Sequence, residues 1–139
     1  MEKVKAHTIL WSVIPVTLIL MIFGVDNVID VQFHDSYLVL ESQETGIIFA
    51  FFTGFLAWIY WLLRDRKLIR ALSLLHAIIT AIAVVGMGVL MILLAEPTAM
   101  HFKNYRILNS IGFVLLFLLS VAQLVFLVNV AITLLRQKT

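Results

Sequence analysis

Residues 71–95 read ALSLLHAIITAIAVVGMGVLMILLA, an apolar run that contains no Asp, Glu, Lys or Arg. At about 1.5 Å of rise per residue, a helix of this length exceeds the roughly 30 Å of a bilayer's hydrocarbon core. A helix also satisfies its own backbone hydrogen bonds, which hydrocarbon demands of any segment that crosses it. The stretch therefore predicts a transmembrane helix.

Three further runs without acidic or basic side chains surround it, at approximately residues 8–24, 46–63 and 107–135. Together the four runs predict an all-α fold, an integral membrane four-helix transmembrane bundle. We expect a single domain over residues 1–139, with a long outer loop at residues 25–45. The first run follows basic residues as a signal peptide would, but Gly24-Val25-Asp26-Asn27 lacks a small-x-small cleavage pattern. This favours a retained helix over a cleaved signal.

The composition indicates the same class of protein. Of the 139 residues, 63% are hydrophobic and 13% are charged, which is more apolar surface than a soluble fold of this size can bury. The net charge is only +2 and the basic residues form short clusters, which argues against a nucleic-acid partner. The absence of cysteine from the sequence excludes disulfides, zinc–thiolate sites, iron–sulfur clusters and thiol catalysis within the chain.

The distribution of lysine and arginine predicts the orientation. If the N-terminus lies inside, the inner side of the membrane holds Lys3, Lys5, Arg64, Arg66, Lys67, Arg70, Arg136 and Lys138. The outer side then holds only Lys103 and Arg106, a bias of eight against two. Because cytoplasmic loops carry the excess of basic residues, we expect both termini in the cytoplasm. The expected location is a bacterial-type cytoplasmic (inner) membrane.

Small and aromatic residues within the runs indicate how the helices pack. Small side chains recur at Gly46, Ala50 and Gly54, and again at Gly86 and Gly88. Such seams let another helix approach closely, either from the same chain or from a partner subunit. Four aromatic residues lie at depths typical of membrane anchoring near the inner interface: Trp11, Trp58, Tyr60 and Trp61.

The last run also carries a polar stripe. Asn109, Gly112, Ser120 and Gln123 lie roughly along one helix face. Amides inside a bilayer need partners, so this face is expected to contact protein instead of lipid. Helix-to-helix contact is the favoured interpretation and a proton path is the alternative. Asn129 is expected on a different face, near the inner interface.

The outer segment carries the most informative pattern. Ile29, Val31 and Phe33 alternate with polar residues, which predicts an extended approach to the second helix. His34 and Asp35 follow directly, and a neighbouring imidazole and carboxylate can hold a divalent ion. Two ligands alone make a weak site, so a hydrogen-bonded turn is the alternative.

The run His34-Asp35-Ser36-Tyr37 resembles the His-Asp-Thr-Tyr motif of haem-copper oxidase subunit I, the catalytic subunit of cytochrome c and quinol oxidases. Weaker similarities follow in the family's order at residues 53–58, 74–76, 109–112 and 126–130. The chain thus resembles the final four helices, ninth to twelfth, of a twelve-helix subunit. The resemblance implies a magnesium or manganese site at His34 and Asp35, completed by a carboxylate from a second subunit.

The departures from that family concern its redox centres. Ser42 and Glu44 occupy the two positions at which the family's tenth helix ligates haem iron, and neither is a usual axial ligand. The helices with the copper ligands have no counterpart, and the Arg-Arg pair for the haem propionates is missing from the loop at residues 96–106. A two-haem, one-copper site needs about six histidines at membrane depth. The chain has four, and His76 alone lies within a membrane run, since His7 is at the inner edge and His34 and His101 are in outer loops.

These observations predict a protein that is not an enzyme. We expect a non-catalytic structural or interaction component of a membrane complex, in contact with the lipid bilayer and with other membrane subunits or further copies of itself. No cofactor is expected beyond magnesium or manganese. A haem- or metal-binding accessory of a respiratory oxidase is the first alternative. A small transporter is the second, although no apolar run holds the carboxylate that proton coupling usually requires.

Overall fold

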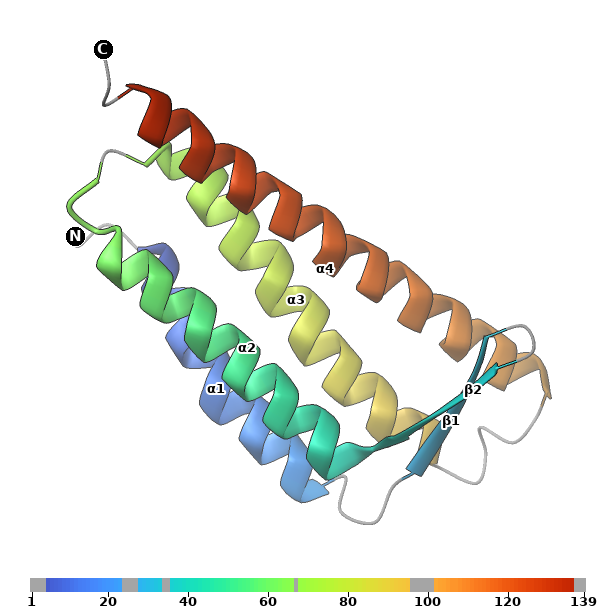
Figure 1. The fold of residues 1–139 in the computed structure, drawn as a ribbon. Helices are drawn as coiled ribbons and strands as arrows, with labels where there is room; N and C mark the ends of the chain where they lie inside the picture. Colours follow the sequence, from blue (N-terminus) through green and yellow to red (C-terminus); the bar gives the residue numbers. More distant parts are fainter. Residues whose placement is uncertain (1–4, 24–27, 34–35, 67, 96–101, 137–139) are drawn as a thin grey trace.

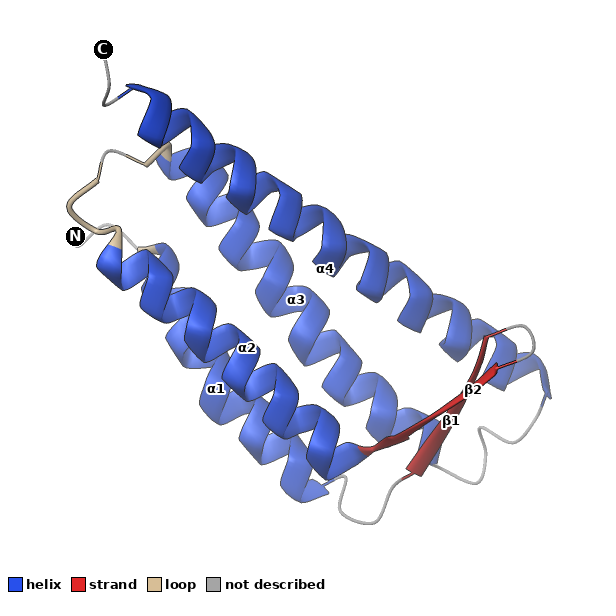
Figure 2. Cartoon of the chain, viewed as in Figure 1, coloured by secondary structure: helices blue, strands red, loops and turns tan. Residues whose placement is uncertain are grey.

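The computed structural model describes residues 5–23, 28–33, 36–66, 68–95 and 102–136. These residues form four helices, α1 (Ala6–Phe23), α2 (Ser42–Leu62), α3 (Arg70–Ala95) and α4 (Phe102–Arg136), shown in Figures 1 and 2. The described parts of α2, α3 and α4 are each long and apolar enough to cross a membrane, and α1 holds a shorter apolar stretch at Ala6–Leu20. The prediction of four helices is confirmed, and three of them have the length and composition predicted for membrane spans.

The outer segment contains a β-hairpin that an all-α description leaves out. Strand β1 (Val28–Phe33) pairs antiparallel with β2 (Ser36–Glu41), with Val28 opposite Glu41 and Phe33 opposite Ser36. The alternation of apolar and polar residues correctly indicated extended structure here. The predicted loop at residues 25–45 is too long, because α2 begins at Ser42 directly after β2. Glu44 in its first turn favours that start, since a carboxylate is stabilised at a helix N-terminus.

Helices that follow one another in the chain run antiparallel, so α1 and α3 point the same way and the bundle has two distinct ends (Figure 1). In Figure 1, α1 begins and α4 ends at the end that holds the α2–α3 turn, and the hairpin lies at the other end. Helix α1 packs against both α2 and α3, and α4 packs along α3. The basic residues of the turn and the start of α1 therefore share one end of the molecule.

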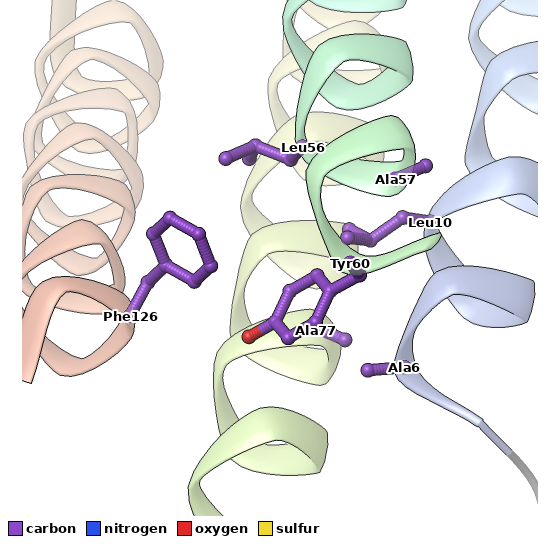
Figure 3. Close-up of a cluster of buried hydrophobic side chains, with 7 residues drawn as sticks. All are labelled: Ala6, Leu10, Leu56, Ala57, Tyr60, Ala77 and Phe126. Atoms are coloured by element: carbon purple, nitrogen blue, oxygen red, sulfur yellow. The ribbon is translucent and has the colours of Figure 1, made fainter. Parts of the chain in front are cut away.

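The main hydrophobic cluster lies toward the turn end and draws on all four helices (Figure 3). Its members are Ala6, Leu10, Leu56, Ala57, Tyr60, Ala77 and Phe126. Ala57 and Ala77 are completely buried. Their small side chains let the helices approach closely around the larger rings of Tyr60 and Phe126, which are drawn in Figure 3.

The glycine seams pack within the chain. A Cβ atom on Gly54 would lie 3.4 Å from Ile14 of α1, and one on Gly86 would lie 3.2 Å from Leu115 of α4. The closest approach is at Gly88, where a Cβ would lie 2.9 Å from Cδ1 of Leu20 in α1. Gly54, Gly86 and Gly88 thus contact other helices of the same chain, as one of the two interpretations predicts.

Substitution of Gly88 should weaken the α1–α3 contact in proportion to size. The one contact under 3.0 Å in Gly88→Ala is with the flexible end of Leu20, which can rotate away, whereas Gly88→Leu forces the two helices apart. We expect Gly88→Leu to cost about 1–3 kcal/mol of unfolding free energy, and Gly88→Ala to cost less than about 1 kcal/mol. Unfolding in detergent followed by circular dichroism measures both. Equal stability of the leucine variant and the wild type would contradict the packing.

The outer surface of the helices is apolar. Phe51 is 76% exposed, Phe117 is 68% exposed and Leu124 is 61% exposed. The three tryptophans that were predicted as membrane anchors are each about half exposed. Tyr60 is the exception, because it is 3% exposed and points inward. Its predicted role as a membrane anchor is wrong, since it lies on the buried face of α2 with Thr53 and Leu56.

Candidate functional site

A chain of hydrogen bonds joins α2, α3 and α4 through the buried His76. The Oη atom of Tyr60 lies 3.0 Å from Nδ1 of His76, and Nε2 of His76 lies 3.3 Å from Oε1 of Gln123. The Gln123 amide nitrogen donates to the carbonyl of Leu119 at 3.2 Å. Since Oε1 can only accept, Nε2 of His76 carries the proton and Nδ1 accepts from Tyr60. This arrangement is satisfied by a neutral imidazole.

Aromatic rings enclose the imidazole. Phe126 of α4 stacks on His76, with ring centroids 5.1 Å apart and planes inclined by 30°. Tyr60 meets Phe126 edge-on at 5.2 Å, which is a favourable geometry for aromatic pairs. His76 has no exposed surface. Both of its nitrogens are engaged within the chain, so coordination of a metal by either one would require the loss of a hydrogen bond.

A second polar contact ties α4 to the start of α3. Oδ1 of Asn129 accepts from the backbone nitrogen of Ile69 at 3.0 Å. Its Nδ2 atom donates to the carbonyl of Ile69 at 3.2 Å and to the hydroxyl of Ser73 at 2.9 Å. The first backbone N–H groups of a helix have no partner within the helix. The Asn129 side chain of α4 therefore supplies a hydrogen-bond acceptor for the backbone at the N-terminal end of α3.

The predicted polar stripe on α4 is only partly right. Gln123 does contact protein, and Gly112 packs so closely on α3 that a Cβ atom added to it would lie 3.0 Å from Cδ2 of Leu90. Ser120 is exposed and its hydroxyl donates to Leu116 of its own helix at 2.9 Å. Asn109 is half-buried. These residues therefore do not form one protein-facing stripe.

Asn129 lies on a different face of α4 from Ser120, as predicted, and that face is the buried one. Asn129 is completely buried and lies on the face of α4 that packs against α3, with Ala122, Phe126 and Thr133. Sequence reasoning missed Ser73 as a hydrogen-bonding partner. Ser73 gives no signal of its own, whereas the i, i+3, i+7 spacing of Thr53, Leu56 and Tyr60 could have placed Tyr60 inside.

The predicted metal ligands His34 and Asp35 lie outside the described residues, as does His101. Within the described part of the chain, no group of three or more His, Asp or Glu side chains could hold a metal ion. Ser42 and Glu44, at the start of α2, have different surroundings, since Ser42 is buried and Glu44 is exposed. His7 is half-buried at the start of α1.

A cleft of about 440 Å³ lies beside the polar cluster at the turn end. Its lining includes Lys5, His7, Arg64, Arg66 and Arg70, together with Tyr60, Ser73 and several apolar side chains. The lining comes from the start of α1, from the end of α2 with the following turn, and from the start of α3. Tyr60 and Ser73 are almost fully buried, so they form the floor of the cleft.

The two features together define the candidate site: a neutral, internally satisfied polar cluster that joins three helices, and a cationic cleft above it. The His76 cluster completes its hydrogen bonds within the chain. Comparisons of the chain with protein-family models, with curated proteins and with solved structures find no match in any of the three.

Proposed function

We propose that this chain is a non-catalytic multi-pass membrane protein that serves as a structural or interaction component of a membrane complex. The observation that carries the proposal is that the polar groups of His76 are engaged within the chain. Tyr60 and Gln123 occupy both ring nitrogens and Phe126 covers a ring face. The imidazole thereby holds helices together and has no nitrogen left for a substrate or a redox cofactor.

The exposure of α4 supports an interaction role. Within the described residues, α3 is the one helix along which α4 packs extensively. Only 17% of the most apolar 18-residue stretch of α4 is buried. Much of this long helix is therefore left for lipid or for a second protein, and contact with other membrane subunits or with further copies of the chain is part of the proposal.

The resemblance to the last four helices of haem-copper oxidase subunit I supplies the class of complex that we propose, a respiratory oxidase or a related assembly. It rests on the order of the motifs, from His34-Asp35-Ser36-Tyr37 to Phe126–Val130. Under this proposal His34 and Asp35 bind magnesium or manganese at most, and the chain carries no haem.

One purified preparation tests the proposal in three ways. We expect no Soret absorption band, no stoichiometric iron or copper, and a detergent-corrected mass above the 15.8 kDa of one chain. A Soret band with stoichiometric iron would instead establish the haem-binding alternative. A monodisperse monomer, both alone and in mildly solubilised native membranes, would contradict the interaction role.

We further propose that both termini face the cytoplasm of a bacterial-type inner membrane, and the lack of cysteine makes this directly testable. Asp65 in the turn and Glu41 at the end of β2 are both exposed, so each can be replaced by cysteine. A membrane-impermeant maleimide should label Glu41→Cys in intact spheroplasts, and Asp65→Cys only after the membrane is opened. The reverse pattern would invert the orientation.

A further inference from the structure

We propose that the cationic cleft at the turn end binds the phosphate of an anionic phospholipid headgroup. Four permanently charged side chains line it, namely Lys5, Arg64, Arg66 and Arg70. Their combined charge is twice the net charge of +2 carried by the whole chain. Among the lining residues that the structure describes, none is acidic. Basic pockets between transmembrane helices are a recurrent form of recognition for lipid phosphates.

The charge of Arg64 is only weakly compensated by the acidic residue beside it. Asp65 approaches Arg64, but its Oδ2 lies 3.7 Å from Nε and its side chain is 86% exposed. A loose, solvated pair of this kind contributes little. The Arg64 guanidinium also lies 4.9 Å from the centre of the Trp61 ring, which holds it at the rim of the cleft while its charge stays available.

The helix ends add to the positive potential. Helix α1 begins at Ala6 and α3 begins at Arg70, and both of these residues line the cleft. The partial positive charge at a helix N-terminus favours an anion nearby. The cleft is thus surrounded by two helix starts as well as by side-chain cations from three separate segments.

The surroundings favour a lipid over a soluble anion. The cleft opens where the apolar helices meet the basic turn, and Leu63, Leu68 and Leu74 line it together with the cations. Trp61, which is 45% exposed, stands at the same boundary, where tryptophan is enriched in membrane proteins. A phospholipid can place its phosphate among the cations while its acyl chains follow the apolar helix surface. Inorganic phosphate gains nothing from that surface.

Occupancy should also stabilise the bundle. Tyr60 and Ser73 form the floor of the cleft and belong to the contacts that join α2, α3 and α4. A ligand that binds only the folded arrangement of these segments shifts the unfolding equilibrium toward the folded state. The inference requires that this end of the bundle lies at a membrane surface, but it is independent of the proposed partner subunit.

Native mass spectrometry of the purified full chain, titrated with phosphatidylglycerol or with phosphatidylcholine, tests the proposal. We expect one phosphatidylglycerol to be retained per chain and phosphatidylcholine to be lost. In Arg64→Gln/Arg70→Gln the affinity for phosphatidylglycerol should fall about thirtyfold, since each basic side chain near a lipid surface contributes roughly fivefold. The matched control Arg136→Gln/Lys138→Gln removes the same charge near the C-terminus of the chain, where Arg136 is not part of the cleft lining, and it should lose less than about threefold.

Two further arms separate the remaining explanations. Arg64→Lys/Arg70→Lys keeps the charge and should retain most of the binding, which excludes misfolding as the cause of the loss. Inorganic phosphate should neither displace phosphatidylglycerol nor raise the melting temperature as the lipid does. Equal losses in the two glutamine variants would overturn the proposal in favour of diffuse attraction, and full competition by inorganic phosphate would replace the lipid with a soluble anion.

Discussion

His76→Ala is expected to lower the free energy of unfolding by about 3 kcal/mol, the larger of the two effects predicted for the polar cluster. The substitution leaves a cavity under Phe126 and removes the partners of the Tyr60 hydroxyl and the Gln123 carbonyl. Cavities of this size and buried polar groups without partners each cost on the order of 1–3 kcal/mol. Reversible unfolding in detergent, followed by circular dichroism, measures the change.

His7→Ala is the matched control for this substitution. His7 is half-buried at the start of α1, outside the cluster, and its loss should cost less than about 1 kcal/mol. A double-mutant cycle then isolates the Tyr60–His76 contact. Tyr60→Phe should cost about 1 kcal/mol in the wild type and clearly less in His76→Ala, where the hydroxyl has already lost its partner on His76. Simple additivity of the two substitutions would show that this hydrogen bond does not contribute to stability.

Asn129→Ala is expected to cost about 2 kcal/mol of unfolding free energy. Its side chain makes three hydrogen bonds to Ile69 and Ser73, and it is completely buried. Interhelical hydrogen bonds inside membranes contribute roughly 0.6 kcal/mol each on average, and the backbone N–H of Ile69 is left without its acceptor. In Asn129→Ala the loss of this acceptor should speed up amide hydrogen exchange at the start of α3 more than in the middle of that helix.

Two variants make the Asn129 prediction specific. Asn104→Ala removes an exposed amide from the other end of the same helix and should leave stability within about 0.5 kcal/mol of the wild type. Asn129→Asp keeps an acceptor for Ile69 but loses the donor to Ser73, and it buries a carboxyl group, so it should be no more stable than the alanine variant. A stable aspartate variant would mean that water reaches this position.

The hairpin and the turn illustrate what local sequence can predict. Alternating apolar residues at Ile29, Val31 and Phe33 indicated extended structure, and β1 has it. The basic cluster at residues 64–70 marked the connection between two spans, and the structure has a turn there followed by α3. Each of these features depends on neighbouring residues in the chain, so a short window of sequence contains the information. The metal site at His34 and Asp35 stays a prediction.

The inward residues show the limit of the same reasoning. Trp58, Tyr60 and Trp61 are adjacent aromatic residues of similar hydrophobicity, yet Tyr60 is buried while both tryptophans are about half exposed. Asn129 and Ser120 are both polar residues of α4, yet Asn129 is completely buried and Ser120 is exposed. In a soluble helix the apolar stripe marks the buried face. In a membrane helix lipid is as apolar as the protein interior, so that signal is lost.

The sequence by itself determined that four uncharged segments form helices, that basic residues gather between them, and that the chain lacks the histidines of an oxidase centre. Those properties belong to each segment separately, because transfer into lipid depends on a segment's own length and charge. Only the tertiary structure decided that His76 is enclosed by Tyr60, Gln123 and Phe126, that Asn129 joins α4 to the start of α3, and that cations from three segments line one cleft. These contacts depend on how each helix is rotated and offset against its neighbours, which is set by the packing of all the helices together.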